Sequence, residues 1–448
     1  MIINFLIIIQ EISMSEKLVS IFCLTYNHVG YIRDALDGFV NQKTNFKYDV
    51  FVYDDASTDG TSDILMKYQE MYPDVFNVYI SERNTWKDEN RHKFLYDLEI
   101  KNLNAKYVAV CEGDDYWTDE NKLQMQVDYM EAHPECSMYI HNCEWLECTT
   151  NTSKPGNAID IDGEGDVSTG ELILEKNGHP PTASFLYRRE LLQQDFFFFD
   201  AVVGDYPLML CAASVGKVHY NNKIMSVYRY KAKGSWSSRL TSESYENKLF
   251  QCYHYIGVMD FLFKYNRYTD FKYKNIVKTR ILLCADSLSY VLEKLNLSEQ
   301  QLYDSCVQHG FYLKESCKTV IRMGHKIAEY RQKTFMENKT KQFIDQYNNI
   351  VIMGTGKYSQ ILSQQFENYH IDFEGYSVTK LMDNKKKFNE KKVWQLNQLP
   401  YDKEELGVVV GILIKDKEDI VKSLKEAGIV NYIMPYDFDW LLDKECSD

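Results

Sequence analysis

Three carboxylates fall within four residues of one short segment, VAVCEGDDYW (108–117), directly after an apolar run. They are Glu112, Asp114 and Asp115. A loop that concentrates one sign of charge repels itself unless a cation neutralises it. Oxygen ligands of this kind suit a hard divalent ion such as Mg²⁺ or Mn²⁺, which completes its shell with water and substrate phosphates. The segment therefore indicates a metal-bound diphosphate, although an acidic turn before a helix is the simpler alternative.

Two more polar clusters follow short apolar runs of the kind that form buried strands. They are Thr25, Tyr26 and Asn27 after LVSIFCL (18–24), and Asp54 and Asp55 after YDVFVY (48–53). A carboxylate at a strand end can accept hydrogen bonds from ribose hydroxyls or a base N–H, although helix capping explains part of the DDASTDGT motif. Because the carboxyl ends of parallel strands meet at one edge of an open sheet, we expect all three clusters at one ligand-binding edge.

The elements that position these clusters alternate between strand and helix. Apolar runs predict strands at 18–24, 48–53, 75–80 and 106–111. The segments between them carry apolar residues at helical spacing. This alternation predicts an α/β fold built on an open, mostly parallel sheet. A long stretch rich in Tyr, Lys and Leu then predicts helices, and near the C-terminus the α/β pattern returns, which predicts a second, small Rossmann-like unit.

The chain of 448 residues is too long for one core, and we predict four regions. They are an N-terminal extension (1–16), the main α/β domain (17–240), a helical segment (241–348) and the Rossmann-like accessory domain (349–448). The apolar run 2–9 is too short to span a bilayer and lacks the features of a signal peptide, and Met14 is an alternative start to Met1. We expect a cytoplasmic protein, with peripheral association at the inner face of the membrane left open.

The composition narrows the classes of partner. A net charge of -14 with no long Lys or Arg block argues against nucleic acid, whose phosphates require clustered basic residues. An acidic protein still binds a phosphorylated small molecule when it recruits a metal ion. The eleven cysteines are scattered, without a CxxC pair or zinc-like spacing, so we expect reduced, mostly buried thiols.

Three segments, in order and at matching spacing, resemble the inverting family 2 glycosyltransferases, which have the GT-A fold. They are VSIFCLTYNHVGYI (19–32), DVFVYDDASTDGT (49–61) and AKYVAVCEGDDYWTDENKLQMQV (105–127). Within that family the chain is similar to transferases of bacterial surface-polysaccharide assembly, over about residues 17–240. The resemblance implies transfer of a sugar from a nucleotide-diphosphate sugar, with UDP expected, to a hydroxyl of a glycan or lipid-linked glycan, aided by Mn²⁺ or Mg²⁺.

The resemblance also implies roles for individual residues that bind the donor. Thr25, Tyr26 and Asn27 would hold the base, Asp54 and Asp55 would contact uracil or ribose, Asp114 would meet the ribose or the metal, and Asp115 would bind the metal. Glu112 stands where many members have Asp, so its part in metal binding is left open. Arg91 and Arg83 are both candidates for the basic residue that meets the diphosphate, and we include Arg91 in the predicted site.

An inverting transfer also requires a general base, because the acceptor hydroxyl loses its proton as it attacks the anomeric carbon opposite the leaving diphosphate. The resemblance expects this base well beyond the metal motif, where VVGDYPLML (202–210) supplies Asp205. Asp205 also precedes a predicted helix, so capping is its alternative role. We expect the segment GHPPTASFLYRRELL (178–192) to form a wall on the acceptor side.

A weaker motif lies in the C-terminal domain. GTGKYS (354–359) follows a predicted strand and opens a predicted helix, the context of a dinucleotide-binding turn. The sixth position is Ser359 rather than glycine, and the next strand, FEGYSVTK (373–380), ends without the acid that would bind a ribose. The motif leaves open an alternative function, an NAD-dependent oxidoreductase or a nucleotide-binding regulatory protein acting through this domain. The helical segment is a candidate surface for oligomerisation.

Overall fold

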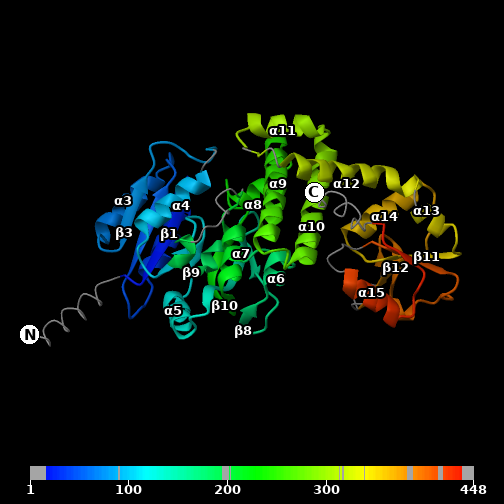
Figure 1. Cartoon of the computed structure of the whole chain (residues 1–448), viewed down its shortest axis with the longest axis horizontal. Helices are drawn as coiled ribbons and strands as arrows, with labels where there is room; N and C mark the ends of the chain where they lie inside the picture. Colours follow the sequence, from blue (N-terminus) through cyan, green and yellow to red (C-terminus); the bar gives the residue numbers. More distant parts are fainter. Residues whose placement is uncertain are drawn as a thin grey trace, which may run out of the picture. The chain divides into compact units, whose positions relative to one another are not determined.

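The predicted α/β class is confirmed: the chain contains a large sheet, a helical segment and a second, smaller sheet (Figure 1). The computed structural model describes residues 17–435 except 89–90, 194–200, 202, 312, 315–316, 338, 381–386 and 412–416. The predicted N-terminal extension, residues 1–16, lies outside the described residues. The chain divides into two compact units, residues 1–277 with 300–315, and residues 278–299 with 316–448.

Four parallel strands form one half of the large sheet, in the order β3-β2-β1-β4. Their bounds are β1 Val19–Thr25, β2 Tyr48–Asp54, β3 Phe76–Ile80 and β4 Tyr107–Val110. All four apolar runs that predicted strands therefore form strands. Thr25 of β1 lies in register with Asp54 of β2, and the N–H of Gly113, after β4, donates to the carbonyl of Leu24 at 2.8 Å. The three polar clusters consequently share one edge of the sheet, as predicted.

The other half of the sheet is mixed rather than parallel, and continues from β4 in the order β9-β6-β10-β5. Its strands are β5 Tyr116–Trp117, β6 Cys136–Glu147, β7 Thr152–Pro155, β8 Glu164–Val167, β9 Leu186–Arg188 and β10 Lys217–Tyr230. β10 is parallel to β6 and antiparallel to β5 and β8, while β9 is antiparallel to β4 and β6. β5 follows the turn after β4 and pairs with β10, so the acidic turn lies between the parallel and the mixed halves of the sheet.

Helices pack against the parallel strands of the large sheet. Their bounds are α2 Ile32–Val40, α3 Thr61–Met71, α4 Arg91–Asn102 and α5 Lys122–Ala132. Val19, Ile21 and Cys23 alternate along β1 and enter one core with apolar residues of α2, α3 and α5. Between them in the strand, Phe22 points the other way and stacks on Phe51, with ring centroids 6.0 Å apart. Burial on both faces is what a near-continuous apolar strand requires.

Further helices lead from the large sheet into the helical segment, which is helical as predicted. They are α6 Thr169–Leu174, α7 Asp205–Val215, α8 Trp236–Thr241, α9 Tyr245–Tyr268, α10 Lys274–Leu295, α11 Glu299–Gln308, α12 Cys317–Glu337 and α13 Lys339–Ile344, with 3₁₀ helices at Thr182–Ser184 and Arg189–Gln193. α9 and α11 belong to the first compact unit, whereas α12 and α13 belong to the second. Of the helices formed by described residues, none is long and apolar enough to cross a bilayer.

The second unit contains the smaller sheet, in the order β13-β14-β12-β11-β15-β16 (Figure 1, yellow to red). Its elements are β11 Asn349–Met353, α14 Lys357–Asn368, β12 Gly375–Val378, β13 Lys387–Phe388, β14 Lys391–Gln395, a 3₁₀ turn Leu396–Gln398, β15 Leu406–Val410, α15 Lys417–Glu426 and β16 Tyr432–Ile433. GTGKYS joins β11 to α14, in the predicted context. Ser359 is buried there and donates its hydroxyl to the Gly411 carbonyl at 3.0 Å, so this departure from glycine is used in packing.

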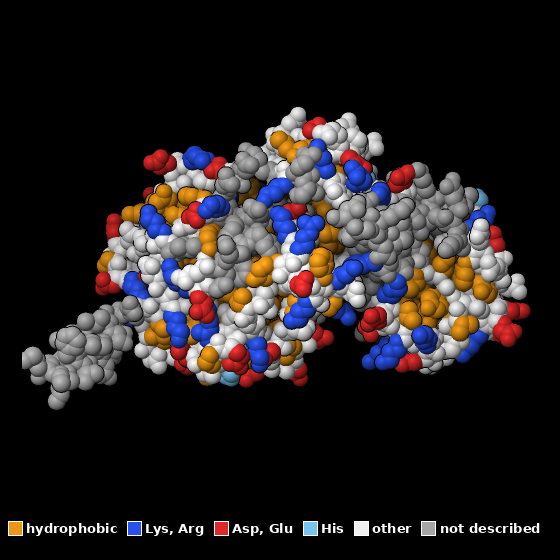
Figure 2. Space-filling view, in the orientation of Figure 1, with side chains coloured by type: hydrophobic (Ala, Val, Ile, Leu, Met, Phe, Trp, Pro, Cys, Tyr) orange, Lys and Arg blue, Asp and Glu red, His pale blue; other side chains and the backbone are white. Residues whose placement is uncertain are grey.

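The distribution of surface charge and the burial of the cysteines are as the composition indicates. Figure 2 shows basic and acidic side chains interspersed on the face that it draws. Among the described residues, ten cysteines are free thiols, and nine of these are buried. Such thiols behave as small apolar core residues.

Candidate functional site

Hydrogen bonds tie the loop after β1 to the loop after β2. Asn27 has a left-handed backbone (φ 55°), its N–H donates to Ser57 Oγ at 2.8 Å, and its Oδ1 accepts the N–H of Thr58 at 2.8 Å. Tyr26, beside it, leaves 41% of its surface exposed, whereas Thr25 is buried. Of the three predicted base-binding residues, Tyr26 is thus open to solvent, Asn27 shapes the loop and Thr25 lies within the sheet edge.

The two aspartates after β2 are both turned into the protein. Asp54 is fully buried, and its carboxylate accepts the hydroxyls of Ser57 and Ser62, each at 2.5 Å. Asp55 is 2% exposed and its Oδ1 accepts both the N–H and the hydroxyl of Thr85, at 2.7 and 2.8 Å. Asp54 therefore shapes this loop through Ser57 and Ser62, and Asp55 connects the loop to the one before α4.

The two candidate arginines lie in different surroundings. The side chain of Arg91 is only 14% exposed, its Nη2 lies 3.6 Å from Asp55 Oδ2, and its guanidinium lies over the Trp86 ring, 5.0 Å from the centroid. Arg83 is 69% exposed and makes a two-point ion pair with Asp88, at 2.8 and 2.6 Å. Arg91 is therefore the arginine that faces the carboxylates at the sheet edge.

The turn after β4 packs directly against the end of β1. A Cβ atom at Gly113 would lie 2.7 Å from Thr25 Oγ1 and 2.8 Å from Ile32 Cδ1, closer than real atoms approach. Glycine is therefore required for this turn to lie where it does. The close approach brings the cluster after β4 against the cluster after β1.

Arg229 of β10 holds the same turn from the other side. Its N–H donates to Asp115 Oδ1 at 2.8 Å, and its Nη1 donates to the Asp114 carbonyl at 2.8 Å. The guanidinium also pairs with Asp34 of α2. It lies over two aromatic rings, those of Tyr31 and Tyr116, at 5.2 and 4.4 Å from their centroids. One buried cation therefore joins β10, α2 and the acidic turn.

The carboxylates of the turn strongly affect one another. Burial raises the pKa of Glu112 to about 8, with further contributions from the charges of Asp114 and then Asp205. Burial, followed by Asp114 and Glu112, also raises the pKa of Asp115 well above its usual range. The influence of Asp205 on Glu112 means that these two acids, distant in the sequence, lie near each other in space. A divalent cation would relieve this concentration of charge.

Asp205 is the first residue of α7 and has two defined contacts. The N–H of Tyr206 donates to its Oδ1 at 2.8 Å, and the Nε2 of His179 lies 3.3 Å from its Oδ2. The second contact is an ion pair, aligned too poorly for a full hydrogen bond. About a third of the Asp205 side chain remains exposed (34%), so the carboxylate is still reachable.

His179 completes a chain of carboxylate, imidazole and carboxylate. Its Nδ1 lies 2.5 Å from Glu175 Oε1, on the side opposite Asp205. Burial would lower the pKa of His179, but Asp205 and Glu175 together raise it to about 10. Burial would raise the pKa of Asp205, but the charge of His179 lowers it to about 2. At neutral pH the imidazole is therefore protonated and Asp205 is ionised.

Sequence reasoning missed His179 and Glu175. The signal that was present is their spacing of four residues in EKNGH (175–179), which ends inside the segment 178–192 that was predicted only as an acceptor-side wall. The role of Arg229 was also missed, because its partners Asp34, Asp114 and Asp115 lie far from it in the sequence. Each of these residues acquires its meaning from a partner far along the chain.

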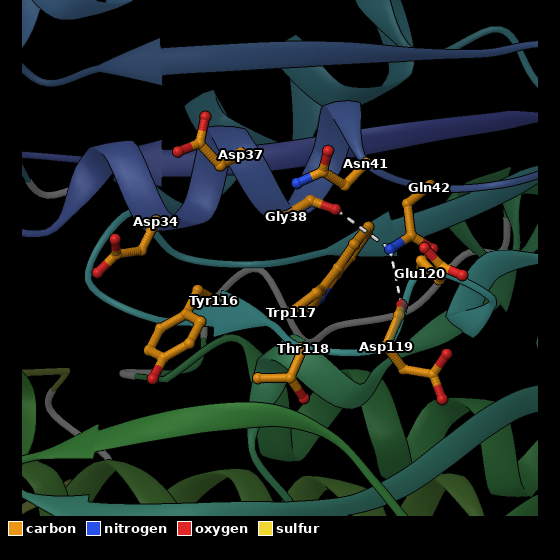
Figure 3. A pocket seen from close by; sticks show the side chains of 10 residues that line it. All are labelled: Asp34, Asp37, Gly38, Asn41, Gln42, Tyr116, Trp117, Thr118, Asp119 and Glu120. Atoms are coloured by element: carbon orange, nitrogen blue, oxygen red, sulfur yellow. Dashed lines mark hydrogen bonds between the residues drawn. The ribbon is translucent and has the colours of Figure 1, made fainter.

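A hollow of about 660 Å³ lies between α2 and residues 116–120 (Figure 3). Gln42 Nε2 donates there to the carbonyls of Gly38 and Asp119, at 3.1 and 2.9 Å. None of the predicted site residues lines it. Among the residues that the structure describes, no set of three His, Cys, Asp or Glu side chains is arranged to hold a metal ion by itself.

The family model and a named relative that match this chain both indicate a glycosyltransferase. Residues 20–196 match the family model described as glycosyl transferase family 2. An uncharacterized protein of Mycobacterium tuberculosis (strain ATCC 25618 / H37Rv) is 34% identical over 223 residues, which are 50% of this chain and 62% of that protein. A proposed teichuronic acid biosynthesis glycosyltransferase of Bacillus subtilis (strain 168), TuaG, is 33% identical over 207 residues, which are 46% of this chain and 67% of TuaG. The match thus spans less than two thirds of the mycobacterial relative.

Solved structures are more distant. Staphylococcus aureus TarS 1–349 in complex with UDP-GlcNAc has a TM-score of 0.40 at 16% identity, covering 69% of this chain and 92% of that chain. The mannosyltransferase PcManGT from Pyrobaculum calidifontis, in complex with GDP-Man and Mn²⁺, has a TM-score of 0.42 at 13% identity, covering 71% and 89%. At such low TM-scores, no residue role is carried over to this chain.

We expect Arg229→Gln to lower the free energy of unfolding by about 2 kcal/mol, because it removes the partly buried hydrogen bond to the Asp114 carbonyl, the pairing with Asp34 and two cation–π contacts. Urea denaturation measures this difference. The matched control is Arg83→Gln, which breaks only an exposed ion pair and should leave stability nearly unchanged. Equal effects of the two substitutions would contradict the role assigned to Arg229.

Proposed function

The chain belongs to the family 2 glycosyltransferases, and we propose that it transfers a sugar, with inversion, from a nucleotide-diphosphate sugar to a hydroxyl group of a glycan or lipid-linked glycan. UDP is the expected nucleotide. The observation that best supports this proposal is that the acidic turn after β4 and the Asp55–Arg91 pair lie at one edge of the sheet, where the charge of Asp205 also acts on Glu112. A displacement at a sugar carbon requires a base and an acidic turn near each other. The base takes the proton of the attacking hydroxyl, while the acidic turn, through a metal ion, would stabilise the departing diphosphate.

On the donor side, the exposed ring of Tyr26 is available to the base. Asp55 orients Arg91 by an ion pair of 3.6 Å. The guanidinium of Arg91 suits the diphosphate of the donor. Asp54 and Thr25 support this side from within the sheet edge rather than by direct contact. The proposal therefore keeps the predicted residues but divides them into residues that contact the donor and residues that hold the loops.

A divalent ion, Mn²⁺ or Mg²⁺, fits the chemistry of the turn. Burial is the largest cause of the raised pKa values of Glu112 and Asp115, and the neighbouring carboxylates add negative charge that a cation would neutralise. Asp114 and Asp115 would hold the ion, and one or two carboxylates suffice when diphosphate oxygens complete the shell. When bound, such an ion stabilises the charge that develops on the leaving diphosphate.

Asp205 is the proposed general base. The acceptor oxygen attacks the anomeric carbon as the bond to the diphosphate oxygen breaks, and the hydroxyl proton passes to the Asp205 carboxylate. The transition state has oxocarbenium character, as in glycoside hydrolysis. Because its pKa lies at about 2, Asp205 is ionised before the acceptor arrives, so no prior deprotonation step is needed.

The wider setting is part of the same proposal. The name of the relative TuaG supports an acceptor in polysaccharide synthesis, which would take place in the cytoplasm or at the inner face of the membrane. The strand order around β11 supports a Rossmann-like accessory domain. An oligomer formed through the helical segment stays a prediction.

We expect Asp205→Asn to reduce sugar transfer by about 10²–10⁴-fold, because the amide cannot take up the acceptor proton. Release of UDP from a panel of UDP-sugars with Mn²⁺ measures the reaction, and calorimetry with UDP and Mn²⁺ should give nearly unchanged donor-side affinity. Asp63→Asn, an exposed aspartate of α3, is the matched control. Full activity of Asp205→Asn would remove Asp205 from the role of base.

Asp114→Ala should weaken the Mn²⁺-dependent part of UDP binding by about tenfold or more, because it removes a ligand of the ion. Calorimetry with UDP, in Mn²⁺ and in EDTA, separates that part from metal-independent binding. If the variant gains as much affinity from Mn²⁺ as the unaltered protein does, the turn does not hold the metal. Asp63→Ala serves as the control for loss of a carboxylate.

The two candidate ligand classes are distinguished by thermal shift. UDP with Mn²⁺ should raise the unfolding midpoint of the full chain, because a ligand that binds only the folded state stabilises it. NAD should not. A shift with NAD and none with UDP and Mn²⁺ would favour the oxidoreductase alternative.

A further inference from the structure

His179 lies between two carboxylates that come from different elements. Glu175 directly follows the last residue of α6 and has a left-handed backbone (φ 45°), and Asp205 begins α7. Only 10% of the Glu175 side chain and 23% of the His179 side chain are exposed. The rings of Phe185 and Tyr206 stand edge-on to the imidazole, at centroid distances of 5.9 and 6.3 Å. The imidazole therefore faces a carboxylate at each nitrogen and is flanked by two aromatic rings.

We propose that His179 is a positioning residue for Asp205: as an imidazolium held by Glu175, it keeps the carboxylate of Asp205 ionised and fixes its orientation toward the acceptor. This inference rests on the proposed function, because it takes Asp205 as the base. Tyr206 N–H occupies Oδ1 and His179 stands at Oδ2, so both oxygens are held. Each carboxylate oxygen has a second lone pair, which stays available for the acceptor proton.

The charged groups around His179 make the imidazolium the stable form. Two carboxylates contact it, Glu175 and Asp205, and Glu112 of the acidic turn adds a more distant negative charge. His254 of α9 acts on Asp205 in the same direction as His179, lowering its pKa. One cation between two contacting anions leaves the cluster with a net negative charge, so protonation of the imidazole is favoured despite its burial.

Glu175 has a separate part in this arrangement. When the acceptor proton reaches Asp205, that carboxylate becomes neutral and no longer stabilises the imidazolium. Glu175 remains ionised and keeps the proton on His179, so His179 neither gives nor takes a proton in the step. The proton on Asp205 passes to solvent after the product leaves, which its partial exposure permits.

The first test is the pH dependence of UDP release from the most active UDP-sugar. Removing the imidazolium by His179→Gln leaves burial as the main influence on Asp205, which raises its pKa. A higher pKa means that the ionised base is lost at a higher pH as pH falls, so the acidic limb should move upward by about one to three units. His370→Gln, an exposed histidine of the second unit, should leave the limb in place.

The outcomes separate this inference from the proposed function. If His179→Gln leaves the acidic limb in place while Asp205→Asn is inactive, His179 only packs beside the base and the inference is overturned. If Asp205→Asn remains active, the proposed base fails, and with it the reason for a positioning residue. A KM that rises alone, with kcat and its pH profile unchanged, would also overturn the positioning role.

The second test does not depend on turnover. NMR of the protein labelled at histidine ¹³Cε1, with the His179→Gln spectrum to assign the signal, follows the protonation of His179 directly. We expect no titration between about pH 5 and 8 in the unaltered protein, and a pKa lower by about one to three units in both Asp205→Asn and Glu175→Gln. Titration near the usual histidine pKa of about 6.5 in the unaltered protein would overturn the inference, even if His179→Gln fails to fold.

Discussion

Negative charge gathered at the carboxyl edge of the large sheet is the constraint on which the rest of the site depends. Carboxylates from three elements meet there, after β2, after β4 and at the start of α7. Partly buried acids of this kind destabilise one another unless cations lie beside them. The chain supplies three such cations from other elements: Arg91 of α4 beside Asp55, Arg229 of β10 beside the acidic turn, and His179 beside Asp205.

Neutralisation is complete at some positions and incomplete at others. Asp205 has a lowered pKa because its partner cation outweighs its burial, whereas Glu112 keeps a raised pKa because burial and its neighbouring acids outweigh the cations nearby. The edge therefore combines one carboxylate that is ionised in advance with a turn whose charge is still unrelieved. Ionisable groups with strongly perturbed pKa values in such a place are typical of functional sites, and the difference separates the proposed base from the proposed metal turn.

The mixed topology of the sheet brings these parts together. The parallel half carries the loops after β1, β2 and β4, while β10 of the mixed half carries Arg229. β5 directly follows the acidic turn and pairs with β10, the strand whose Arg229 binds that turn. Gly113 adds the contact with the end of β1, where no side chain fits. The site is thus held by backbone pairing and close packing as much as by its charges.

The sequence by itself determined the strands of the parallel half and the candidate carboxylates, because apolar runs and acidic clusters are local patterns. It offered Arg91 and Arg83 for the diphosphate and included Arg91 in the predicted site, and it placed His179 only within a predicted acceptor-side wall. Only the tertiary structure decided that Arg91 faces the site, that Asp54 turns inward to shape its loop, and that Asp205 has a histidine partner. The physical reason is that burial and partnership depend on residues far apart in the chain, which meet only when the sheet edge is assembled.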